Sequence, residues 1–105
     1  MFEEIKEKCP KGYGEVNKYL SEFDALWEIK PLESIIGWLF RFFDSVGIRV
    51  AVIPHTNGTF RPYLFKKAGK VWTFLELEGD EYGFSIRLEA WKVAFTKAFE
   101  ILEQR

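Results

Sequence analysis

The strand expected at residues 70–78 carries apolar side chains on both of its faces. Trp72 and Phe74 alternate along it with Val71 and Leu75. An antiparallel strand with one wet face normally shows apolar side chains on the other face only. The two rings therefore need either a second layer of structure above them or a flat partner that stacks on them.

Helix and turn signals around this strand predict one α+β domain, residues 1–105, of 12.4 kDa. Apolar residues at spacings of three and four predict helices over 13–28, 31–46 and 89–104. Turn residues separate four expected strands, at 48–54, 59–66, 70–78 and 82–88. The expected order is two N-terminal helices, a four-stranded antiparallel meander and a C-terminal helix (ααββββα).

The turn at Gly79-Asp80 predicts how the last two strands face each other. Gly in the first central position suits a two-residue type II′ turn. That register pairs Trp72 with Arg87, Phe74 with Ser85 and Leu75 with Phe84. Alternation then assigns a core set on the fourth strand: Tyr82, Phe84, Ile86 and Leu88. Trp72, Phe74 and Arg87 should share the opposite face.

Two further loops decide which residues join that face. If a two- or four-residue connection closes at Lys67–Lys70, Tyr63 and Phe65 join it and Arg61 opposes Glu76. If the loop has three residues and a bulge, Leu64 joins instead. The first is favoured because it pairs ring with ring and charge with charge. A three-residue loop ending at Gly58 would add Arg49 and Ile53, with Lys66, Lys67 and Lys70 lying at one end.

Aromatic rings interleaved with arginines suit unpaired nucleic acid, because bases stack on rings and guanidinium groups hold phosphates. The competing interpretation is that the helices at 13–28 and 31–46 cover these rings as a second core. An intermediate arrangement would leave a hydrophobic cleft with basic edges. The candidate nucleic-acid-binding residues are Arg49, Arg61, Tyr63, Phe65, Lys70, Trp72, Phe74 and Arg87.

Composition and motifs limit the other functions. The net charge of −1 gives no overall basic excess of the kind found in duplex-DNA binders. One cysteine, Cys9, excludes an internal disulfide, and the longest apolar stretch is too short to span a bilayer. We expect a cytoplasmic protein with no membrane partner. Asn, Gln, Cys and Met are few, as in proteins of thermophiles.

No arrangement typical of an enzyme is evident. His55 is the single histidine and falls in a predicted turn, and Cys9 has no partner for nucleophilic catalysis. The carboxylates around Gly79-Asp80 are typical of a solvated turn, and no Gly-rich phosphate loop occurs. We therefore expect no catalysis, no metal and no cofactor. The bulky apolar stripe of the last helix could pair with a second copy of the chain.

Residues 61–95, RPYLFKKAGKVWTFLELEGDEYGFSIRLEAWKVAF, carry a resemblance. With the aromatic helices before them, they resemble the archaeal ThermoDBP family and its Thermococcales relatives, which bind single-stranded DNA or RNA through a hydrophobic cleft with basic edges. The resemblance implies that the cleft is formed by Tyr63, Phe65, Trp72 and Phe74, edged by Arg61, Lys70 and Arg87. ThermoDBP proteins of Thermoproteales dimerise by a C-terminal leucine zipper that this sequence lacks, so a homodimer should use another surface.

Two hypotheses follow. The first is a binder of single-stranded DNA or RNA with little base specificity. The second is a protein-interaction or oligomerisation module whose aromatic face packs on another protein. Salt separates them, because nucleic-acid binding weakens steeply with ionic strength.

Overall fold

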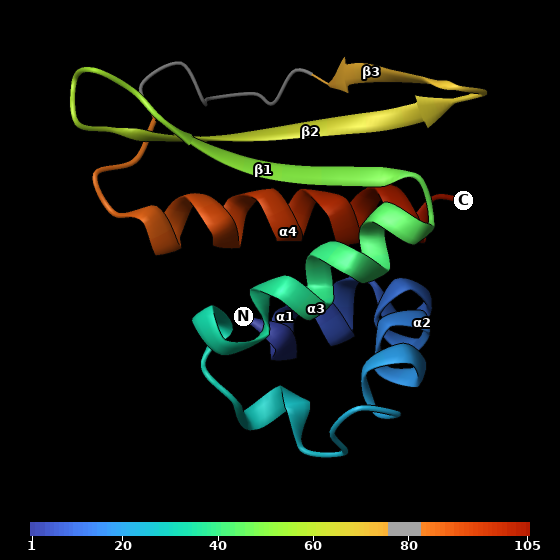
Figure 1. The fold of residues 1–105 in the computed structure, drawn as a ribbon. Helices are drawn as coiled ribbons and strands as arrows, with labels where there is room; N and C mark the ends of the chain where they lie inside the picture. The colour runs from blue at the N-terminus through green and yellow to red at the C-terminus, as the bar shows by residue number, and fades with distance from the viewer. Residues whose placement is uncertain (76–82) are drawn as a thin grey trace.

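The computed structural model describes residues 1–75 and 83–105, in which α-helices pack on one side of a small sheet (Figure 1). The elements in chain order are α1 (Phe2–Lys8), α2 (Pro10–Leu20), the 3₁₀-helix η1 (Trp27–Ile29), α3 (Leu32–Ser45), β1 (Ile48–Pro54), β2 (Phe60–Ala68), β3 (Val71–Leu75) and α4 (Arg87–Glu103). The sheet is antiparallel, in the order β1-β2-β3. The predicted α+β class is confirmed.

The first hairpin turns through the predicted three-residue loop. The amide of His55 donates a hydrogen bond of 2.8 Å to the carbonyl oxygen of Thr59, which leaves Thr56, Asn57 and Gly58 as the loop. Gly58 has φ of +82°, the left-handed conformation that such a loop needs at its last position. Because an odd loop length fixes which residues share a face, the parity of β1 against β2 is as predicted.

The second hairpin has the predicted faces but a different register. Ala68 lies opposite Val71, so the loop is Gly69-Lys70, with Gly69 at φ of +64°. The pairing is shifted by two residues from the one expected, and Phe65 now lies opposite Phe74. A shift of two leaves every side chain on its predicted face. The expected pair of Arg61 with Glu76 falls outside the described residues.

The predicted fourth strand is not borne out in the described residues, from 83 onward. Phe84 forms one isolated bridge, to Phe60 on β2 and not to Leu75 on β3. The predicted pairing of Trp72 with Arg87 is also wrong, because α4 already begins at Arg87. Ile86 was expected in the core but is 59% exposed. The apolar alternation of Phe84, Ile86 and Leu88 continues into the apolar stripe of α4. The turn at Gly79-Asp80 and Tyr82 lie outside the described residues.

The N-terminal part differs from the single helix predicted over 13–28. An unpredicted helix, α1, precedes it, and α2 ends at Leu20. Beyond it the Asp24 carboxylate accepts a hydrogen bond of 2.8 Å from the amide of Leu26, which stabilises a turn. Trp27 is fully buried, and its indole N–H donates to the side-chain oxygen of Asn17 at 2.8 Å. The helix over 31–46 is essentially confirmed as α3.

The core lies between the helices and one face of the sheet. Helix α4 packs on β1 and β2, and α3 packs on β1. Fully buried side chains fill the space between them: Phe43, Ile48, Val50, Leu64, Phe95 and Phe99. Figure 1 shows α1, α2 and α3 on the same side of the sheet as α4. The N-terminal helices therefore do not cover the face that carries Trp72 and Phe74. In the described residues, no helix is long and apolar enough to cross a membrane.

Candidate nucleic-acid interface

The sheet face that points away from the helices is built from alternate residues of all three strands. Arg49 lies opposite Phe65, which lies opposite Phe74, so this row crosses the sheet from β1 to β3. We call this surface the open face, and its members are Arg49, Ala51, Ile53, Arg61, Tyr63, Phe65, Lys67, Trp72 and Phe74.

On the open face the ring of Phe74 contacts two other rings, those of Tyr63 and Phe65. The ring centroid of Phe74 lies 5.6 Å from that of Tyr63 and 5.8 Å from that of Phe65, with interplanar angles of 47° and 61°. Phe74 is 47% exposed, although two aromatic neighbours support it. We call Tyr63, Phe65 and Phe74 the ring platform. Phe74 is its exposed member, while Tyr63 and Phe65 are half-buried.

Trp72 lies beneath two cations. The guanidinium carbon of Arg49 is 4.1 Å from the centroid of the indole, and the Lys67 ammonium is 5.9 Å from it. The Arg49 Nε donates a hydrogen bond of 2.8 Å to Oδ1 of Asp44, near the end of α3. A cation over an indole face is favourable electrostatically. Part of the Trp72 ring is therefore occupied by Arg49.

His55 extends the same face at the far end of β1. Its ring stacks on Tyr63, with a centroid distance of 6.3 Å and an interplanar angle of 16°, and its Nε2 lies 3.2 Å from the Tyr63 hydroxyl. Sequence reasoning assigned His55 only to a turn. Extending the alternation of β1 by one step, from Ile53 to residue 55, would have found it.

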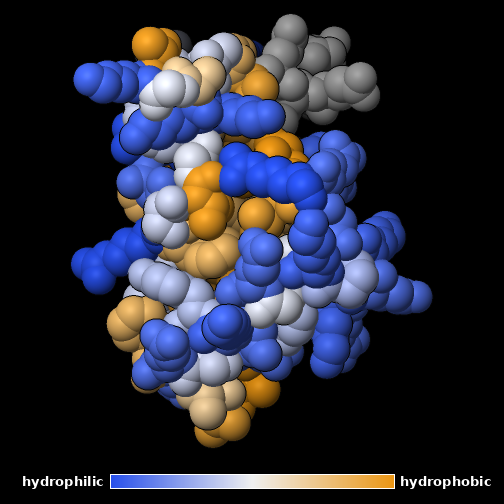
Figure 2. Space-filling model, turned by 90° about the vertical axis from the view of Figure 1, so that its right-hand side faces the viewer, coloured by the Kyte–Doolittle hydropathy of each residue, from blue (hydrophilic) through white to orange (hydrophobic). Residues whose placement is uncertain are grey.

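The charge of the sheet differs sharply from that of the rest of the chain. Residues 48–75 contain no Asp or Glu and five basic residues: Arg49, Arg61, Lys66, Lys67 and Lys70. The remaining residues carry ten Lys and Arg against sixteen Asp and Glu. The net charge of −1 thus hides a basic sheet attached to an acidic remainder. The end of the molecule where β2 turns into β3 is largely hydrophilic, with small apolar areas between (Figure 2).

Six of the eight candidate residues lie together on the open face, and two do not. Lys70 is in the Gly69-Lys70 loop, at the end of the hairpin. The prediction for Arg87 is wrong, because this residue begins α4. Its guanidinium carbon lies 5.0 Å from the ring centroid of Phe60, and the Phe60 side chain alternates onto the helix-facing side of the sheet. Lys67 was placed near the site by the sequence but was not among the candidates.

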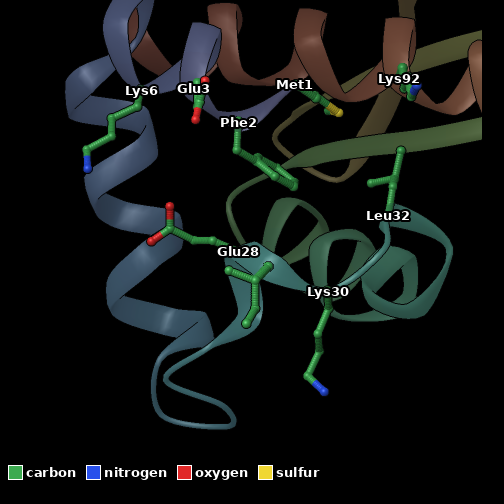
Figure 3. A pocket seen from close by; sticks show the side chains of 9 residues that line it. Met1, Phe2, Glu3, Lys6, Glu28, Lys30, Leu32 and Lys92 are labelled. Atoms are coloured by element: carbon green, nitrogen blue, oxygen red, sulfur yellow. The ribbon is translucent and has the colours of Figure 1, made fainter.

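A large hollow among the described residues lacks polar groups that converge on one point. It has a volume of about 550 Å³ and lies between the N-terminus, the η1 segment and α4. Figure 3 shows Lys6, Glu28 and Lys30 extending in different directions. Lys30 pairs with Asp24 at 3.2 Å. Within residues 1–75 and 83–105, no cluster of three or more His, Cys, Asp or Glu could hold a metal ion.

Among the described residues, the groups with a shifted pKa lie away from the open face. Burial raises the pKa of Cys9 between α1 and α2, and nearby Glu103 adds to the effect, which disfavours a reactive thiolate. Burial likewise raises the pKa of Tyr13. The pKa of Asp24 is lowered by the hydrogen bond from the amide of Leu26 and by Lys30. These shifts belong to the helical half of the fold.

Comparisons with known proteins do not assign a family. No family model matches the chain, and neither curated proteins nor solved structures gave a significant match. The resemblance to ThermoDBP proteins therefore stays a prediction. Any functional conclusion has to come from the residues of the open face.

Proposed function

We propose that this protein binds single-stranded DNA or RNA on its open face, with little base specificity. The observation that carries the proposal is that aromatic rings, of which Phe74 is 47% exposed, and basic side chains lie on the same strands, which contain no Asp or Glu of their own. Stacking of a base on an aromatic side chain contributes about 1–3 kcal/mol, and cations beside it neutralise the phosphates. The open face supplies both kinds of contact within one surface.

Single strands fit this surface better than a duplex. An aromatic side chain of the ring platform can stack only on a base whose face is free. In a duplex both faces of a base are already stacked on the neighbouring base pairs, whereas a single strand can expose them. Every base has such a face, and phosphate contacts carry no sequence information. Little discrimination between sequences is therefore expected.

Acidic residues that lie far from the open face have little effect on binding there. At physiological ionic strength, exposed charges more than about 8 Å apart are largely screened from each other. A strand on the open face is close to Arg49 and Lys67, which lie over Trp72. Local charge therefore decides the interaction, and the net charge of −1 has little weight.

A titration followed by fluorescence anisotropy tests the proposal. Labelled single-stranded DNA, single-stranded RNA and a duplex of equal length are titrated at several salt concentrations. We expect the single strands to bind more tightly than the duplex. The logarithm of the binding constant should fall with the logarithm of salt concentration, by about 0.7 for each phosphate neutralised. Absence of binding to both single strands at low salt would overturn the proposal.

A protein partner is the second candidate, because the open face also exposes apolar surface. Ile53 is 44% exposed on it and Phe74 is 47% exposed. An apolar protein interface depends little on salt, in contrast to a nucleic-acid complex. Self-association that persists at high salt, measured by light scattering after size exclusion, would favour this candidate, particularly if Phe74→Ala abolishes it.

A further inference from the structure

We propose that Asp44 is a positioning residue, which holds Arg49 on Trp72 so that its guanidinium meets a phosphate beside the ring platform. The inference rests on the proposed function and assigns separate tasks within the open face. The ring platform takes a base. The arrangement of Asp44, Arg49 and Trp72 takes the backbone next to that base.

Two contacts from different elements fix the Arg49 side chain. Helix α3 supplies the Asp44 carboxylate, 2.8 Å from Nε, and β3 supplies the Trp72 ring, 4.1 Å from the guanidinium carbon. The hydrogen bond fixes the direction of the group, and the ring supports it from below. Nε carries one of the five N–H donors of the guanidinium, so the four donors on the two Nη atoms are not used by this bond.

Arg49 remains accessible in this position. Its side chain is 43% exposed, while that of Asp44 is 35% exposed. Arg49 also lies in the row that continues through Phe65 to Phe74. Neighbouring strands are about 4.8 Å apart, so roughly 10 Å of sheet separates the backbone of Arg49 from that of Phe74. A base on the ring platform and its phosphate at Arg49 can therefore belong to the same short stretch of strand.

Helix stability does not explain an acidic residue at position 44. Asp44 is in the last turn of α3, and no basic residue accompanies it there. The C-terminal end of a helix carries partial negative charge, so a carboxylate there is unfavourable. An exposed ion pair in turn contributes little to the stability of a fold. What the Asp44 side chain does in this region is accept the hydrogen bond from Arg49.

An ordered arginine binds a phosphate with a smaller entropic cost. A free arginine loses its rotamer freedom when it binds, whereas Arg49 is already held by its two contacts. The planar guanidinium can then offer two parallel N–H groups to the phosphate oxygens. The direction of the mutational effect follows: loss of Asp44 should weaken binding, although it removes a negative charge beside a polyanion site.

The test compares Asp44→Asn with Glu33→Gln in anisotropy titrations against a labelled oligo-thymidine strand. Both changes remove one acid from α3, but no ion pair or hydrogen bond links Glu33 to Arg49. We expect Asp44→Asn to raise Kd about two- to tenfold, because a neutral amide oxygen holds Arg49 less firmly than a carboxylate does and more of its rotamer freedom is then lost on binding. Glu33→Gln should leave Kd unchanged or lower it slightly. An equal or lower Kd for Asp44→Asn would overturn the inference.

Arg49→Lys supplies the second arm, because it keeps the charge and loses the planar group. Adding Asp44→Asn to Arg49→Lys should weaken binding no further, whereas fully additive effects would contradict a shared role. The Arg49 Nε–H resonance and the Trp72 indole resonance report the free geometry, and Asp44→Asn should shift both. If Phe74→Ala weakens binding and Asp44→Asn does not, the inference fails and the proposed function stands. If the unaltered protein does not bind, both fail.

Discussion

The two faces of the sheet carry different kinds of side chain, although the same strands form both. Leu64 points toward the helices and is fully buried, and its neighbour Phe65 points the other way into the ring platform. Ile48 and Val50 lie near Leu64 on the covered side, and all three are buried aliphatic side chains. On the open face the apolar residues are mostly aromatic, and cations stand among them. Adjacent residues in one strand thus belong to different chemical environments.

The two faces therefore differ in how much their side chains contribute to the stability of the fold. The covered face completes a core with the helices, and burial of aliphatic side chains there stabilises the fold. The rings of the open face contact each other, His55 or, at Trp72, two cations, and they do not contribute to the core. An antiparallel sheet can carry polar residues on such a side. Phe74 is 47% exposed there, so its ring adds less to the stability of the fold than a buried side chain does. The proposed stacking of a base would give this exposed ring a role in binding.

The largest expected effect is on the covered face. Leu64→Ala should lower the free energy of unfolding by about 2–5 kcal/mol, because it leaves a cavity at a fully buried position. Phe74→Ala should lower it by at most about 1.5 kcal/mol, the range of a half-exposed ring pair on a sheet. Urea titration measures both. Equal losses in the two variants would show that the open face is part of the core.

The second prediction concerns binding and reverses the order of the two faces. Phe74→Ala should weaken single-strand binding by about 1–3 kcal/mol, the contribution of one stacked base. Val71→Ala is the matched control, because Val71 is 65% exposed but alternates onto the side opposite to Phe74. Its Kd should not change. A similar loss in both variants would indicate nonspecific apolar contact and would remove the distinction between the faces.

The third prediction uses two adjacent lysines of β2. Lys67 is on the open face beside Trp72, and Lys66 lies opposite Ile48 and so alternates to the other side. Lys67→Gln should raise Kd a few-fold and reduce the salt dependence by about 0.7, the value for one phosphate on a single strand. Lys66→Gln carries the same charge change and should alter the salt dependence less. Equal changes in Kd and in salt dependence for the two variants would mean that a positive charge contributes to binding equally from either side of the sheet.

The faces of the sheet could be predicted from the sequence because they depend on parity alone. Gly58 and Gly69 both adopt positive φ and mark the two loops. Gly69 suits a loop of either parity, and the pairing of ring with ring and charge with charge favoured the correct one. The register of the second hairpin was less predictable. Phe65 opposite Phe74 and the expected pairing differ by two residues, and both put ring near ring. Local sequence does not distinguish two such pairings.

The expected fourth strand and the tertiary contacts of the site were beyond sequence reasoning. Phe84, Ile86 and Leu88 alternate like a strand, but Leu88 also begins the apolar stripe of α4, and packing of that helix on the sheet prevails. Arg87 was consequently assigned to the wrong place. The contact of Asp44 with Arg49 joins a helix end to a strand across a tight turn. No periodicity in the sequence reports such a contact.

The smallest expected effect is on stability, at the contact where helix and open face meet. Asp44→Asn should change the free energy of unfolding by no more than about 0.5 kcal/mol. The lost surface ion pair contributes about 0.2–1 kcal/mol, and relief of an acid at the C-terminal end of α3 offsets it by a similar amount. Urea titration at low salt measures the difference. A loss of stability above about 2 kcal/mol would show that Asp44 is needed for the fold. A near-zero change in stability together with weaker binding would show that Asp44 serves the open face and not the fold.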